Sequence, residues 1–179
     1  MRSTSLLVAA AAALAPSIAA AHPQDSAINK VYAQIKDARA AADVPGMAGA
    51  FGPAALLIDP RSPRPILGAE LEARLRPMAA RLVADQVKVQ TEYRIERRSV
   101  MGDVAVDAGL MHMRFAGTDG GTLSRPDLPW PKQDQYARFL VTLQRQPDGR
   151  WLIIGDASLP ATAETWAAAQ RQEGLHFDG

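Results

Sequence analysis

The order of apolar patterns along the 179-residue chain is the feature that most restricts its fold. Apolar residues recur at helical spacing from Ile28 to Ala42, and a short apolar run then ends at Asp59. A second helical pattern follows Gly68, and from Gln86 onward apolar residues recur at every second position, which is the period of a β-strand. The chain is therefore predicted to form helices first and a multi-stranded sheet after them, as α+β domains do.

The first predicted helix carries one residue that breaks its pattern. Arg39 lies four residues after Ile35, on the apolar stripe, so its side chain either extends past the helix end or pairs with a buried carboxylate. Asp43 is predicted to cap a short second helix, which Gly52 and Pro53 are expected to stop.

The sheet is predicted from five apolar segments and one strong turn signal. Pro147-Asp148-Gly149 favours a hairpin between the last two strands. A terminal helix is expected after Pro160. The predicted strands are 54–58, 86–95, 104–115, 136–146 and 150–158, and the terminal helix is 161–172.

Composition excludes several classes of function. The net charge is +1, which gives no electrostatic reason to expect a nucleic-acid partner. The chain has no cysteine, so disulfides, thiol catalysis and thiolate metal sites are excluded. No metal-ligand cluster or phosphate-binding loop stands out in the sequence, so no metal and no cofactor are predicted.

The first 21 residues resemble an export signal. Arg2 is followed by an apolar run, Leu6 to Leu14, that is too short to span a bilayer, and Ala19 to Ala21 provide a cleavage site. The sequence therefore predicts a periplasmic or secreted protein with no membrane insertion after signal cleavage. The predicted domain is 22–160, and a C-terminal helix and tail occupy 161–179.

Several short motifs in this order resemble the nuclear transport factor 2-like superfamily, in its SnoaL-like and ketosteroid-isomerase-like bacterial branch. They are Asp43-Val44-Pro45-Gly46-Met47, Leu56 to Pro60, Ile66-Leu67-Gly68, Val100 to Ala105, and Asp148-Gly149-Arg150-Trp151. The resemblance implies a curved, mostly antiparallel sheet wrapped around the N-terminal helices, a cone with an internal apolar pocket. It also implies a homodimer through the outer face of the sheet.

The resemblance implies a possible catalytic site. Asp59 matches the general base of the ketosteroid isomerases, and Tyr32 lies one helical turn from Ile35, the position that matches their oxyanion donor. Their third site residue, a neutral acid, falls near Val141 or Thr142, and neither is an acid. The steroid-isomerase mechanism is therefore in doubt for this chain.

Each candidate residue also has a structural interpretation. Asp59 can simply begin an Asp-Pro turn, and Tyr32 can pack on the sheet. His112, in the middle of a predicted strand, can transfer protons near neutral pH or form a structural hydrogen bond.

We expect a binding module whose pocket accepts a small apolar or amphipathic molecule. The alternative is an isomerase, cyclase or dehydratase that uses Asp59 as base with His112 or Tyr32 as partner, and a third possibility is a structural role at the outer sheet face. The expected pocket walls are Tyr32, Tyr93, Met111, Met113, Trp130 and Tyr136.

Overall fold

The computed structural model describes residues 23–60, 62–117, 134–169 and 176–177. Its helices are α1 (Asp25–Ala40), α2 (Val44–Ala48), α3 (Gly68–Ala84) and α4 (Ala163–Ala168). Its strands are β1 (Phe51–Ile58), β2 (Ile66–Leu67), β3 (Val87–Met101), β4 (Val104–Gly117), β5 (Asp134–Arg145), β6 (Trp151–Pro160) and β7 (His176–Phe177).

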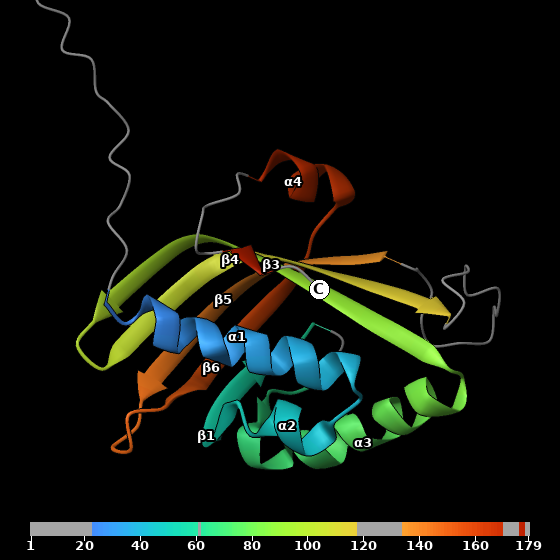
Figure 1. The fold of residues 1–179 in the computed structure, drawn as a ribbon, viewed down its shortest axis with the longest axis horizontal. Coiled ribbons are helices and arrows are strands. Elements are labelled where there is room, and N and C mark those ends of the chain that lie inside the picture. Colours follow the sequence, from blue (N-terminus) through green and yellow to red (C-terminus); the bar gives the residue numbers. More distant parts are fainter. Residues whose placement is uncertain (1–22, 61, 118–133, 170–175, 178–179) are drawn as a thin grey trace, which may run out of the picture.

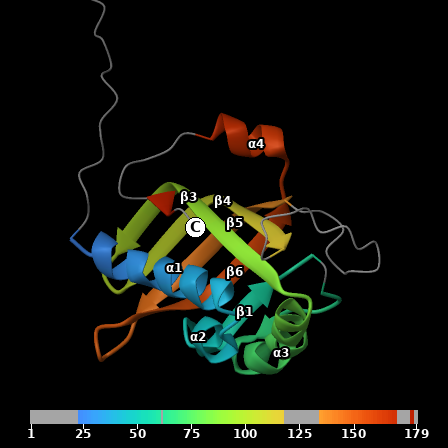
Figure 2. The same ribbon diagram turned by 45° about the vertical axis from the view of Figure 1, so that its right-hand side comes forward.

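The strands form one curved sheet in the order β2-β1-β6-β5-β4-β3-β7. Among the described strands only β1 and β6 pair in parallel, and the other neighbouring strands are antiparallel. The sheet curves around α1, with α2 and α3 beside it on the same side, and α4 lies on the opposite, convex face (Figures 1 and 2). The predicted α+β class, with a mostly antiparallel sheet wrapped around the N-terminal helices, is confirmed.

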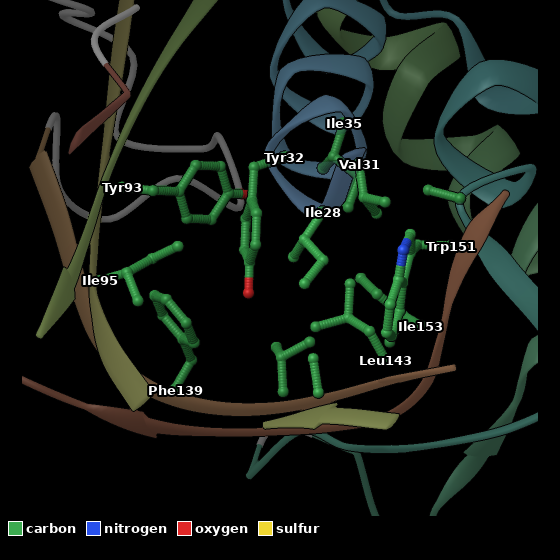
Figure 3. Packing of buried hydrophobic residues seen from close by; sticks show 13 residues of the cluster. Ile28, Val31, Tyr32, Ile35, Tyr93, Ile95, Phe139, Leu143, Trp151 and Ile153 are labelled. Carbon is green, nitrogen blue, oxygen red and sulfur yellow. The ribbon is translucent and has the colours of Figure 1, made fainter. Parts of the chain in front are cut away.

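The main core lies between α1 and the concave face of the sheet. Ile28, Val31 and Ile35 supply the apolar stripe of α1, and the sheet contributes an aromatic cluster beneath it (Figure 3). The ring of Tyr32, which α1 itself contributes, packs against that cluster, 5.2 Å from the ring of Tyr93 and 6.1 Å from the ring of Phe139. Burial of these large side chains is what fixes α1 against the sheet.

Local signals explain where the elements begin and end. The Asp43 carboxylate accepts a hydrogen bond from the Gly46 backbone N–H, so the predicted helix cap is confirmed. Gly102 and Gly149 have φ angles of 63° and 86°, which allow the tight turns from β3 to β4 and from β5 to β6.

The predicted boundary between α2 and β1 was wrong. Gly52 and Pro53 do not stop α2, which ends at Ala48; they belong to β1 instead. The parallel pairing of β1 with β6 is irregular between Phe51 and Leu56, and Pro53 fits in this interval because it has no N–H to donate.

The C-terminal region also differs from the prediction. The expected helix over 161–172 is only the six residues Ala163–Ala168, and a two-residue strand, β7, pairs with the edge of β3. The predicted signal segment, 1–21, lies outside the described residues. Within the described part of the chain, no helix has the length and apolar character needed to cross a membrane.

Candidate functional site

A cavity of about 60 Å³ lies between α1 and the concave face of the sheet. We call it the inner cavity. Its apolar wall comes from Ile35, Phe51, Met111, Phe139, Val141 and Ile153. Its polar lining comes from Tyr32, Arg39, Tyr93, Asp156 and Ser158.

Arg39 is the positive charge of the inner cavity. Its Nη1 donates hydrogen bonds to the Thr91 hydroxyl at 3.2 Å and to the Tyr93 hydroxyl at 3.1 Å, and lies 3.7 Å from the sulfur of Met111. The side chain thus follows neither predicted alternative: it turns into the cavity, where its acceptors are neutral groups on β3 and β4. A guanidinium has five N–H donors, and only those on Nη1 make bonds with described residues.

Asp156, on β6, is the acidic residue that lines the inner cavity together with Arg39. Burial raises the pKa of its carboxyl to about 6, although a hydrogen bond from the Ser158 hydroxyl and the charge of Arg39 oppose the shift. The negative charge of Asp59 adds to the rise in this pKa. A carboxyl with a pKa near 6 can exist in both protonation states around neutral pH, which suits proton transfer.

A second buried polar group lies beside the cavity and holds α1 to the sheet. Asp107 has no exposed surface, and it accepts two hydrogen bonds of 2.8 Å from Arg98 and one of 2.8 Å from the Tyr32 hydroxyl. Arg98 also donates to Asp25 at 3.2 Å and to Asn29 at 2.8 Å, both on α1. We call these residues the Arg98 network.

Within the Arg98 network, Tyr32 is held neutral and Arg98 is held charged. Burial, followed by the charge of Asp107, raises the pKa of Tyr32 well above its usual value, so the phenol stays neutral. Burial alone would lower the pKa of Arg98, but its hydrogen bonds and ion pair with Asp107 outweigh burial, and the pKa is raised. The hydrogen bonds of the network therefore hold α1 against the sheet, and the pKa values of Tyr32 and Arg98 do not suit them to exchange protons near neutral pH.

Three of the residues predicted from the sequence meet at the inner cavity, namely Tyr32, Tyr93 and Met111. Tyr32 presents its ring, while its hydroxyl donates to Asp107. Asp59 follows β1 and does not line the cavity, whose acid is Asp156. Met113 packs instead against the separate cluster of Leu82, Val87, Val89 and Phe115.

His112 and Tyr136 lie on the other side of the sheet. Neighbouring residues of a strand point to opposite faces, so His112 points away from the cavity that Met111 lines. The His112 ring stacks on Tyr136 at 4.6 Å and lies 5.4 Å from the ring of Trp166 on α4, and its Nε2 is 2.8 Å from the Asp134 carboxylate. Contrary to the expectation from the sequence, Tyr136 therefore does not wall the cavity. Trp130, another expected wall residue, lies outside the described residues.

Arg39, Asp107 and Asp156 were not among the predicted site residues. A signal existed for two of them: Arg39 breaks the apolar stripe of α1, and Asp107 interrupts an apolar strand. The strand register places the two acids on either side of one residue, because Asp107 pairs with Val141 and Val141 pairs with Asp156. The structure thus places an acid on each side of Val141, the position where the resemblance implied one. Among the described residues, no group of three or more histidine, aspartate or glutamate side chains could hold a metal ion.

No family model matches the sequence, and a comparison with curated proteins finds no significant match. Solved structures do match. Aln2 from a Streptomyces species is similar with a TM-score of 0.62 and 15% identity, over 84% of this chain and 98% of that one.

Two further structures bear directly on the class of fold. A ketosteroid isomerase-like protein from Erwinia carotovora atroseptica matches with a TM-score of 0.55 and 14% identity, over 78% of this chain and 98% of that one. A nuclear transport factor 2-like protein of unknown function from Pseudomonas putida matches with a TM-score of 0.55 and 17% identity, over 83% of this chain and 92% of that one. The chain therefore has the nuclear transport factor 2-like fold.

Proposed function

We propose that the protein is a binding module whose inner cavity accepts a small amphipathic molecule. The observation that carries this proposal is the lining of the cavity, in which an apolar wall is combined with two charged groups, Arg39 and Asp156. Ligand sites commonly combine an apolar lining with a few polar groups that orient the ligand. The fold supports the proposal only in general terms, because the same fold serves many functions.

A thermal-shift screen of small amphipathic compounds tests the proposal. A ligand that binds the native state raises the melting temperature, and we expect hits that a Val141→Phe variant loses because the larger ring fills the cavity. Leu140→Phe is the matched control, since Leu140 is the neighbouring residue and is 51% exposed. A screen in which no compound raises the melting temperature of the wild type contradicts the proposal.

A second candidate function is proton transfer on a small ketone-like substrate, as in an isomerase, cyclase or dehydratase. The observation that favours it is the Asp156 carboxyl, which lines the cavity with a pKa raised to about 6 by burial. The base would then be Asp156 rather than Asp59. Loss of turnover in Asp156→Asn but not in Asp59→Asn supports this assignment, and the reverse result restores Asp59 as the base.

We also propose that the protein dimerises through the convex face of the sheet. This face carries exposed apolar side chains on adjacent strands, and large apolar patches favour association. They include Leu56, Ile58, Leu67, Leu140 and Leu159. Light scattering should give the mass of a dimer that Leu140→Asp reduces to a monomer; a monomeric wild type contradicts the proposal.

Export is proposed on the basis of the N-terminal sequence alone. The expected mature protein begins at His22 or one or two residues earlier. Mass spectrometry of the protein recovered from the periplasm or the medium tests this, and an intact Met1 in that fraction contradicts it.

A further inference from the structure

The inner cavity holds an arginine whose partners are all neutral. Arg39 bonds to two hydroxyls and contacts one sulfur, and among the described residues it makes no ion pair. Its Nε and Nη2 donors make no hydrogen bond with the described part of the chain. A guanidinium binds a carboxylate through two parallel N–H donors, and this is its strongest common interaction.

The second charged group of the cavity, Asp156, does not occupy the free donors of Arg39, so they remain available to a ligand carboxylate. Asp156 lines the same space from β6 but does not approach Arg39, on α1, closely enough to form an ion pair. Ile35, Phe51 and Ile153 line the same cavity, so a ligand would meet both charged groups and an apolar wall. The geometry favours a molecule that carries one anionic end and an apolar remainder.

The size of the cavity limits that remainder. Its volume is about 60 Å³, whereas an engineered apolar cavity of about 150 Å³ is large enough to hold benzene. A ligand that enters without rearrangement is therefore smaller than an aromatic ring, or it extends out of the cavity.

We propose that the inner cavity binds a small carboxylate with a short apolar chain, which pairs with the Arg39 guanidinium, and that Asp156 takes up a proton when it binds. This inference rests on the proposed binding function and specifies its ligand class. No covalent step is involved; one proton moves from solvent to Asp156.

The proton uptake follows from the charges that surround Asp156. The groups acting on it are Arg39 from α1, Asp59 after β1 and the Ser158 hydroxyl on its own strand. The Tyr32 phenol, which also lines the cavity, stays neutral. A bound carboxylate adds a negative charge to a site that already disfavours ionised Asp156, so the neutral form is favoured further. Neutral Asp156 can donate a hydrogen bond to the ligand, and ionised Asp156 cannot.

Calorimetric titration with butyrate and hexanoate, compared with the matched amides, tests the ligand class. We expect the carboxylates to bind at least tenfold more tightly than the amides, and Arg39→Gln to remove that preference. Arg97→Gln, at an exposed arginine of β3, is the control that should keep it. The melting temperature and circular dichroism spectrum of Arg39→Gln establish whether the variant is folded, and Arg39→Lys, which keeps the charge, should retain part of the preference.

The pH dependence tests the role of Asp156. Binding of butyrate should be about tenfold tighter near pH 5.5 than near pH 7.5, and Asp156→Asn should bind with little pH dependence.

The outcomes separate the two proposals. If the amides bind as tightly as the carboxylates, or if Arg39→Gln keeps the preference, the anion assignment is wrong while the binding module stands. If butyrate binds equally tightly at both pH values, the proposed proton uptake by Asp156 is wrong. If neither these probes nor the amphipathic screen gives a ligand, the binding function itself fails.

Discussion

The Tyr32 hydroxyl on α1 donates a 2.8 Å hydrogen bond to Asp107 on β4, a carboxylate with no exposed surface. The two residues are 75 positions apart in the sequence. This contact joins the helix that bounds the inner cavity to the strand that forms part of its wall. The rigidity of the site therefore depends on the Arg98 network.

Tyr32→Phe removes one of the three hydrogen bonds to Asp107. The two from Arg98 remain, so we expect the free energy of unfolding to fall by about 1.5–3 kcal/mol, the usual contribution of one hydrogen bond to a charged group. Urea denaturation measures this change. Tyr136→Phe is the control, because the Tyr136 hydroxyl makes no hydrogen bond with another described residue, and an equal loss in both variants would contradict the prediction.

Arg98→Met leaves the buried carboxylate of Asp107 without its cation. Removal of one partner from a buried ion pair typically destabilises a protein by about 3–5 kcal/mol, and we expect a loss in that range. The double variant Arg98→Met/Asp107→Leu no longer carries the unpaired charge and should recover part of the loss. Urea denaturation of the two variants is decisive: a double variant no more stable than Arg98→Met would show that the charge of Asp107 is not the cause.

Asp156→Asn should change how stability depends on pH. Burial raises the pKa of Asp156 from 3.8 to about 6 in the folded protein, so folding favours its protonated form. This contribution is fully present below pH 3.8, is lost as the pH rises to about 6, and amounts to roughly 3 kcal/mol at most. Asp156→Asn should therefore gain stability relative to the wild type as the pH rises over this interval.

Melting temperatures of both proteins between pH 4 and pH 7 measure this difference. Asp37→Asn is the matched control, because the Asp37 side chain is 76% exposed and should leave the wild-type profile unchanged. Parallel profiles for the wild type and Asp156→Asn would show that Asp156 ionises normally in the folded protein.

Gly109→Ala should destabilise the sheet at the point where it curves beneath α1. A Cβ at Gly109 would collide with the Arg94 carbonyl oxygen and lie 2.9 Å from the Phe139 ring. Overpacking of this kind costs about 1–3 kcal/mol, which chemical denaturation would detect. Gly155→Ala is the control, since its Cβ would lie 3.6 Å from Thr142, an ordinary contact; equal effects at the two positions would contradict the steric explanation.

The sequence alone determined the order of the elements and the class of fold. Helical spacing in α1, the two-residue period from Gln86 onward and the Pro147-Asp148-Gly149 turn are local patterns, and each depends on residues close in sequence. The same alternation also separates Met111 from His112 on β4. Local patterns therefore predicted the architecture well.

The tertiary structure decided which residues meet at the cavity. Asp156 and Arg39 come from a strand and a helix far apart in the chain. Their places around one cavity depend on the register of β5 with β6 and on the position of α1. Asp59 was the candidate acid because it matches the general base of the ketosteroid isomerases, but it follows the end of β1 and is not among the residues that line the cavity. Alternation along a strand shows which side chains share a face, but only pairing between distant strands determines what that face encloses.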